Sequence, residues 1–195
     1  METLSHAWQS LLGAMGTTHP ALLMLALALL PLVGVPASPL IIAAGARMGT
    51  AVGFVAVMVS LTVNFTVGYW LARRWLRSWL TVWLARRGYA IPQLAPGDES
   101  QFILLFRITP GMPLTVQNYV LGLAGVGFAR YMLISLPVQA VYALAFVWFG
   151  QSLTGKATWK LALGVALLVA VGLVVSLLRR YLSRRRAGGA NSIAP

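Results

Sequence analysis

The sequence predicts an all-α polytopic membrane protein, and three observations support this fold class. Of its 195 residues, 59% are hydrophobic and only 9% are charged, and the mean hydropathy of +0.81 is too high for an ordinary soluble domain. The apolar residues form segments long enough to cross a bilayer. Basic residues gather at the ends of these segments, as the positive-inside rule describes, so the net charge of +12 does not indicate nucleic-acid binding. We expect one domain over residues 1–186 and a disordered tail at 187–195.

Residues 20–72 predict a hairpin followed by a transmembrane helix. Residues 20–46 carry no formal charge and are long enough to cross once, but three prolines interrupt them. These are Pro31, Pro36 and Pro39. A re-entrant hairpin that turns near residues 34–39 fits this pattern better than the alternative, a kinked transmembrane helix. Residues 49–72 are uninterrupted and predict a full span, in which Gly53, Ser60, Asn64 and Gly68 indicate helix packing.

Two stretches predict amphipathic helices at the membrane surface. One covers residues 1–18. The other begins the segment 73–100, where tryptophans and leucines recur at helical spacing among five arginines, before a polar loop. Anchoring at the headgroup level is the expected role of the second helix, and specific lipid gating is the alternative.

Residues 101–150 predict a second hairpin plus span. Pro110 and Pro113 remove backbone donors and disfavour helix before them, so a helix entering from Gln101 should break near Thr109. A second full span follows at residues 131–150. The remaining segment, 151–186, predicts a third span at 160–178 and a basic end.

The two halves resemble each other at an offset of 74 residues. A Pro-x-x-Pro-Leu sequence followed fourteen residues on by Gly-Phe occurs in both, so that Pro36 matches Pro110 and Pro39 matches Pro113. With three spans, one side of the membrane carries eleven basic residues and the other three, which predicts a cytoplasmic C-terminus. The hairpins then enter from opposite sides, as in the inverted-topology repeats of many transporters.

An arginine and two helix-breaking prolines coincide at residues 106–119. Backbone groups freed by a break are tolerated in hydrocarbon only where protein buries them or a watery cavity meets them. Arg107 is costly at the same depth unless it has a partner. Break and charge together predict a polar cavity within the membrane, at the point where the two hairpin tips approach.

Two motifs carry a family resemblance that covers roughly residues 20–155. The first is Phe-Arg-Ile-Thr-Pro-Gly-Met-Pro at 106–113, with Asn118, Tyr119 and Gly122; the second is Gly-Val-Pro-Ala-Ser-Pro-Leu at 34–40, with Ala44, Gly45 and Gly49. They resemble the DedA superfamily of VTT-domain (SNARE-associated) membrane proteins. This resemblance implies two opposed re-entrant hairpins and a transporter or scramblase that moves phospholipid or polyprenyl phosphate across the bilayer. It makes Arg107 the motif arginine that faces the lipid headgroup.

The chain also departs from that family's pattern. Bacterial DedA-type members commonly carry intramembrane acids and a second arginine three positions after the motif proline. Here that position is Pro113, and no acid lies between Glu2 and Asp98 or beyond Glu99. The sequence therefore looks closer to the branch with Golgi and other eukaryotic members, which puts proton coupling through a buried carboxylate in doubt.

The implied function suggests headgroup ligands at the helix breaks. A crossing headgroup must replace its water with donors, which a guanidinium and freed amide groups can supply. The candidates are Arg107, Thr109, Gly111, Gln117, Asn118, Tyr119 and Ser38, beside breaks at Pro36, Pro39, Pro110 and Pro113. Each polar side chain could equally satisfy broken backbone, and Arg107 could instead only hold the hairpins together. Arg47 and Arg130, near the hairpin exits, are interface anchors or entry points for anionic lipid.

Two other functional classes stay open: a carrier for small anions or other solutes, and a noncatalytic membrane assembly factor. An enzyme is not expected, because the hairpins offer no acid, histidine or metal ligand set. The chain has no cysteine, and its two histidines lie far apart, so we expect no metal and no cofactor. The expected partners are membrane lipids, with a homo-oligomer left open, and the expected location is a bacterial inner membrane.

Overall fold

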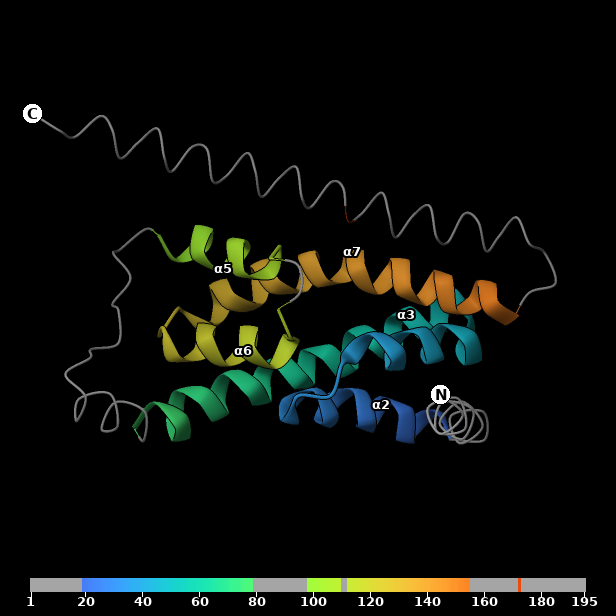
Figure 1. Cartoon of the computed structure of the whole chain (residues 1–195), viewed down its shortest axis with the longest axis horizontal. Helices are drawn as coiled ribbons and strands as arrows, with labels where there is room; N and C mark the ends of the chain where they lie inside the picture. The colour runs from blue at the N-terminus through green and yellow to red at the C-terminus, as the bar shows by residue number, and fades with distance from the viewer. Residues whose placement is uncertain (1–18, 79–97, 110–111, 155–171, 173–195) are drawn as a thin grey trace, which may run out of the picture.

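The computed structural model describes residues 19–78, 98–109, 112–154 and 172, and every regular element in these ranges is a helix (Figure 1). The elements are α2 (Pro20–Leu29), η1 (Leu30–Val33), α3 (Ala37–Leu71), η2 (Ala72–Leu76), α5 (Glu99–Arg107), α6 (Leu114–Leu123) and α7 (Phe128–Thr154). The predicted all-α fold class is therefore confirmed. The surface helix expected at 1–18, the amphipathic stretch beyond Ser78, the span at 160–178 and the tail at 187–195 lie outside the described residues.

The first hairpin forms where the prolines predicted a break. After α2 the chain tightens into the 3-10 helix η1, and Gly34 ends it in the left-handed region with φ 98°, a conformation that glycine adopts without steric cost. Pro36, with φ −58° and ψ 130°, then precedes α3 as its N-cap residue. The beginning of α3 runs back alongside α2 (Figure 1). Residues 20–48 thus form two antiparallel arms rather than one kinked helix.

A second reversal divides α3 into a short arm and a long arm. Gly49 has φ 75° and ψ 178°, which interrupts the helix between Met48 and Thr50. The side chain of Gln151, on α7, accepts a hydrogen bond from the amide of Thr50 at 2.9 Å and another from the Thr50 hydroxyl. Gln151 therefore caps an amide that the interruption leaves without a partner. The long arm beginning at Thr50 corresponds to the span predicted at 49–72.

The second half repeats this plan. Helix α5 ends at Arg107, which confirms the break predicted near Thr109, and α6 begins directly after Pro113. A turn containing Gly125, with φ 75°, leads into the long helix α7. Pro113, with φ −55° and ψ 141°, takes the same place before α6 that Pro36 takes before α3. The 74-residue match paired Pro36 with Pro110 instead, so the structural correspondence at the break is shifted by three residues.

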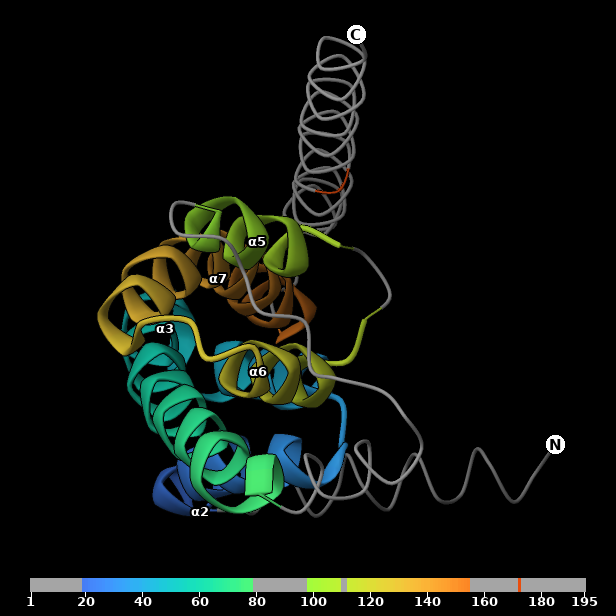
Figure 2. The same ribbon diagram turned by 90° about the vertical axis from the view of Figure 1, so that its left-hand side faces the viewer.

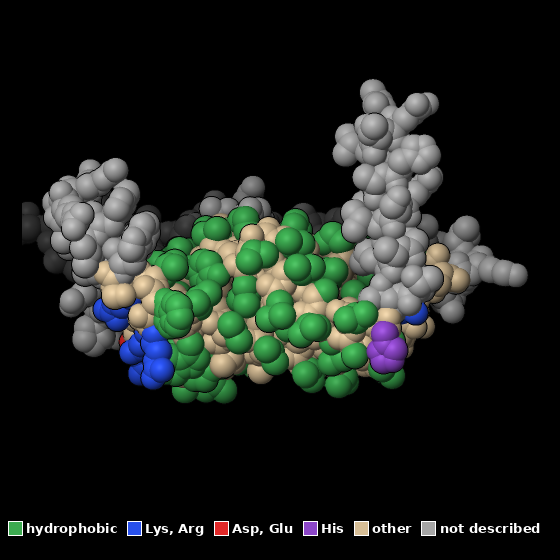
Figure 3. Space-filling view, turned by 90° about the horizontal axis from the view of Figure 1, so that it is seen from below, with side chains coloured by type: hydrophobic (Ala, Val, Ile, Leu, Met, Phe, Trp, Pro, Cys, Tyr) green, Lys and Arg blue, Asp and Glu red, His purple; other side chains and the backbone are tan. Residues whose placement is uncertain are grey.

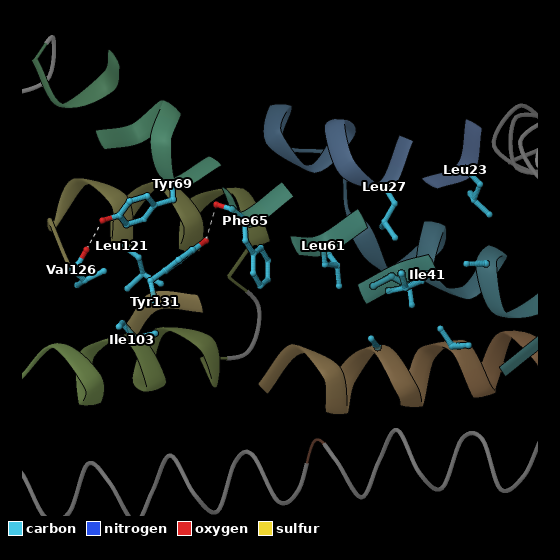
Figure 4. Close-up of a cluster of buried hydrophobic side chains, with 14 residues drawn as sticks. Leu23, Leu27, Ile41, Leu61, Phe65, Tyr69, Ile103, Leu121, Val126 and Tyr131 are labelled. Carbon is cyan, nitrogen blue, oxygen red and sulfur yellow. Dashed lines mark hydrogen bonds between the residues drawn. The ribbon is translucent and has the colours of Figure 1, made fainter. Parts of the chain in front are cut away.

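The two hairpins extend toward opposite ends of the molecule, and their tips meet beside the middle of α3 (Figures 1 and 2). Buried apolar side chains fill the space between α3 and its neighbours along this length (Figure 4). The short arm of α3 and α7 approach to backbone contact. A Cβ added at Gly45 would lie 2.0 Å from the Val147 carbonyl oxygen, and one added at Gly150 would lie 2.0 Å from the Ile42 carbonyl oxygen. Small residues at this crossing therefore have a packing role.

The outer surface identifies an integral membrane protein. Apolar side chains cover the middle of the face shown in Figure 3, with basic side chains at its ends. On the long arm of α3 the exposed valines recur at helical spacing, at positions 52, 55, 59, 63 and 67. Helix α7 has 27 residues, about 40 Å at ~1.5 Å per residue, which exceeds the ~30 Å hydrocarbon core of a bilayer. Both long helices are thus long and apolar enough to cross a membrane.

The glycine contact gives a testable prediction about stability. Replacing Gly150 by alanine should lower the midpoint of thermal unfolding in detergent, because the new methyl group collides with the Ile42 carbonyl and overpacking costs about 1–3 kcal/mol. Gly127→Ala is the matched control, since its Cβ would lie 3.6 Å from the Glu99 carboxylate in ordinary contact. Equal unfolding midpoints for the two variants would contradict the close approach of the short arm and α7.

Candidate functional site

Arg107 projects from the end of α5 into the protein and is only 3% exposed. Its guanidinium donates three hydrogen bonds to side chains from two other helices. Nε donates to the Ser135 hydroxyl on α7 at 2.8 Å, while the terminal nitrogens donate to Gln117 Oε1 at 3.2 Å and Asn118 Oδ1 at 2.8 Å on α6. All three acceptors are neutral. Arg107 therefore joins both arms of the second hairpin to the long helix that follows.

Two aromatic rings complete the surroundings of this guanidinium. Its central carbon lies 4.2 Å from the centroid of the Phe65 ring on α3 and 5.2 Å from that of Tyr131 on α7. A cation near an aromatic face gains about 2 kcal/mol when both are desolvated. The Tyr131 hydroxyl donates to Asn118 Oδ1 at 3.0 Å and lies 3.4 Å from the Phe65 carbonyl oxygen (Figure 4). Phe65 and Tyr131 thus stabilise the positive charge without supplying a negative one.

A chain of amide side chains connects Arg107 to the first hairpin. Asn118 donates through Nδ2 to Asn64 Oδ1 on α3 at 3.0 Å, and Asn64 in turn donates to the carbonyl oxygen of Ala28 at 2.9 Å. Ala28 lies in the last turn of α2, where carbonyl groups lose their helical partners. Asn64 therefore packs helices together, as its position in the span predicted, and it also satisfies backbone freed by the first break.

The hairpin tips themselves are joined through the backbone of η1. The Thr115 hydroxyl donates to the Pro31 carbonyl, and the Tyr119 hydroxyl donates to the Leu32 carbonyl at 2.6 Å. The Pro31 carbonyl also accepts from the Gly34 amide at 3.4 Å, and α6 supplies further donors to the carbonyl groups of this short helix. The meeting of the tips that the sequence predicted is therefore made of side chains bonded to freed backbone.

The charge of Arg107 has no acidic partner in the part of the chain that the structure describes. The described acids, Asp98 and Glu99, lie at the start of α5, and Glu99 pairs with Arg130 at 3.1 Å and accepts from the Gly127 amide at 3.2 Å. The third acid of the sequence, Glu2, lies outside the described residues. Three of the five guanidinium N–H groups donate to the neutral acceptors named above. A buried cation held in this way favours a negatively charged ligand.

The other predicted site residues are distributed unevenly. Asn118 lies in the network around Arg107, and Tyr119 lies at the contact between the tips. The Thr109 hydroxyl donates to the Leu105 carbonyl at 2.6 Å, so it satisfies the end of α5. Ser38 lies half-buried in the first turn of α3 and contributes no bond to this network. Gly111 and Pro110 lie outside the described residues.

The remaining predicted residues lie away from Arg107. Pro39 is in the first turn of α3, next to the break at Pro36. Arg47 and Arg130 are exposed, one near the end of the short arm of α3 and the other in the first turn of α7. These two arginines therefore lie at opposite ends of the molecule, because α7 begins at one end and its last turns contact the short arm at the other.

Sequence reasoning missed Ser135, Tyr131 and Phe65 as members of the site. Each lies within an apolar span where serine and aromatic residues are common, so nothing local distinguished it. One signal was available in retrospect. Ser135 lies four residues after Tyr131, which places both on one face of α7. The described residues contain no group of three or more potential metal ligands.

The network predicts a cost for removing its central acceptor. Replacing Asn118 by leucine should lower the free energy of unfolding by about 2–4 kcal/mol, because it removes bonds to Arg107, Tyr131 and Asn64 while the arginine stays buried. Thermal unfolding of the purified protein measures this. Gln139→Leu is the control, since Gln139 is a half-buried amide on α7 outside the network. A similar loss in both variants would contradict the central role of Asn118.

Comparison with known protein families gives a match over the middle of the chain. The family model for the VTT domain matches residues 35–152, well over half of the chain. The matched region begins just before the break at Pro36 and runs into the last turn of α7, so it includes Arg107 and all of its described side-chain partners. No curated protein and no solved structure matches the chain. The chain belongs to the VTT-domain family, the membrane-associated and generally noncatalytic proteins of the DedA or SNARE-associated group.

Proposed function

We propose that this protein is a lipid transporter or scramblase that moves phosphate-bearing lipids, phospholipid or polyprenyl phosphate, across the bilayer. The observation that supports the proposal is the buried guanidinium of Arg107, which only neutral acceptors and aromatic rings contact among the described residues. A phosphate would supply the missing negative charge and bind the guanidinium fork through two oxygens.

The position of Arg107 suits a headgroup that must leave water. It lies at the end of α5, and its partner Asn118 is connected through Asn64 to the Ala28 carbonyl of the first hairpin. Acyl chains can stay in the bilayer during transfer, because the outer faces of α3 and α7 are apolar. Transfer needs no proton relay in this scheme, since an arginine stays charged and lipid can move down its own gradient.

Binding requires the tips to separate. In the structure Arg107 is closed off from solvent, and Thr115 and Tyr119 join α6 to the carbonyl groups of η1. These are hydrogen bonds to carbonyl oxygens, each worth about 1 kcal/mol, so they can open and close without unfolding a helix.

Exposed Arg47 and Arg130 would attract anionic lipid at the two ends of the molecule. We place the protein in a bacterial inner membrane with its C-terminus in the cytoplasm.

Liposomes provide the direct test. The purified full-length chain, reconstituted with labelled phospholipid or labelled polyprenyl phosphate, should speed exchange between leaflets, and Arg107→Ala should reduce the rate at least tenfold. If neither lipid moves faster than in empty liposomes, the proposal fails. Uptake of a small anion by the same liposomes would instead favour a solute carrier, and inactivity toward both would favour an assembly factor.

A second variant separates binding from folding. Gln117→Glu replaces the acceptor of one Arg107 bond by a carboxylate of the same shape, so the guanidinium gains an internal counter-ion. We expect lipid exchange to fall at least tenfold while the unfolding midpoint is unchanged or higher, because the buried charge is now paired. The substitution also removes the hydrogen bond that Gln117 Nε2 donates to the Met112 carbonyl at 3.1 Å.

Gln101→Glu is the matched control for this change. It makes the same replacement at an exposed position on α5, away from the guanidinium. Normal exchange by Gln101→Glu and slow exchange by a stable Gln117→Glu protein would support phosphate binding at Arg107. Normal exchange by both would show that Arg107 only holds the hairpins together.

A further inference from the structure

We propose that the outer face of α3 at its basic end binds one anionic phospholipid from the surrounding membrane, at a site separate from Arg107. The site is a surface hollow of about 410 Å³, which we call the α3 groove. It is lined by Thr66, Val67, Trp70, Leu71, Arg74 and Trp75. These residues recur at helical spacing, so they share one face of α3 and the following π-helix η2.

Two consecutive arginines of η2 have different surroundings. Arg73 is half-buried and donates to the Tyr69 hydroxyl and to the Val126 carbonyl at 3.3 Å, and Tyr69 itself donates to that carbonyl at 2.6 Å. Arg73 is therefore held by protein groups at the turn before α7. Arg74, the next residue, lines the groove instead.

Arg74 offers a positive charge that the described part of the protein does not neutralise. Its guanidinium lies 5.3 Å from the centroid of the Trp70 ring, and the side chain is exposed. Within the described ranges it has no hydrogen bond or ion pair, and Glu99 is engaged by Arg130. Stacking on an indole fixes the position of the guanidinium while leaving its N–H edge available to an oxyanion.

The groove continues from this charge onto apolar surface. Trp75 and Trp70 are 74% and 41% exposed, which is typical of indoles at the headgroup level of a membrane. From Trp70 toward the middle of α3, the exposed valines at 67, 63 and 59 continue along the helix at helical spacing. A phospholipid fits this arrangement, because its phosphate can bind Arg74 while an acyl chain lies along these valines. A free phosphate would leave the apolar surface unused.

The groove and the Arg107 site lie on different faces of α3. Asn64 and Phe65, which contact the network around Arg107, are fully buried, whereas the groove residues face outward. Lipid binding in the groove therefore requires no separation of the hairpin tips. Lipid binding in the groove can therefore be disproved without disproving lipid transport at Arg107, and the reverse also holds.

Fluorine NMR of the full-length protein labelled with 5-fluorotryptophan gives a readout at this site. The signals of Trp70 and Trp75 are assigned by their loss in Trp70→Phe and Trp75→Phe proteins. In nanodiscs of phosphatidylcholine, added phosphatidylglycerol should shift both signals to saturation. Trp148, exposed on α7 toward the opposite end, is an internal reference that should not respond.

Two variants that change the net charge equally decide the outcome. Arg74→Gln should raise the phosphatidylglycerol fraction at half-saturation about fivefold, the effect of one arginine near an anionic headgroup. Ala129→Glu lowers the net charge by the same one unit at the same end of the molecule, at an exposed position in the first turn of α7, and should leave the midpoint unchanged. An unsaturable response, or an equal change in both variants, would overturn the proposal, because general surface charge would then explain the binding.

Discussion

The structure depends on a buried arginine that is bonded to neutral groups. Moving a guanidinium out of water is costly, and here Ser135, Gln117, Asn118 and the Phe65 and Tyr131 rings offset the cost without a carboxylate among the described residues. These groups come from α3, α6 and α7, so the charge can stay buried only when those helices are assembled around the end of α5. A single cation thereby fixes the relative positions of four helices.

The helix breaks serve the same assembly. Breaking a helix within a membrane frees carbonyl groups that hydrocarbon cannot satisfy. In this protein the carbonyls of Ala28, Pro31 and Leu32 become acceptors for Asn64, Thr115 and Tyr119. At the interruption at Gly49 the roles are reversed, because the amide of Thr50 donates to the side-chain oxygen of Gln151. Each of these breaks therefore creates a specific attachment point for a polar side chain from another helix.

The sequence predicted the elements better than the contacts. Proline spacing and apolar length indicated the breaks near Pro36 and Thr109 and the two long spans, because both signals are local. Arg107 was recognisable because a charge in an apolar segment is costly wherever it lies. Its partners were not recognisable, because Ser135 and Gln117 are 18 residues apart in the sequence and no local pattern indicates that both bond to the same guanidinium. The sequence match at an offset of 74 residues paired Pro36 with Pro110, whereas the residue that precedes α6 as Pro36 precedes α3 is Pro113.

The glycines at 45 and 150 have a mechanical consequence. Backbone atoms touch at this crossing with no side chain between them, so the short arm of α3 and α7 cannot slide past each other by a residue without collision. The tips of the two hairpins, by contrast, are joined by hydrogen bonds from hydroxyl groups to carbonyl oxygens. The contact between the short arm of α3 and α7 therefore resists sliding, whereas the contact between the hairpin tips depends on hydrogen bonds that can break and re-form.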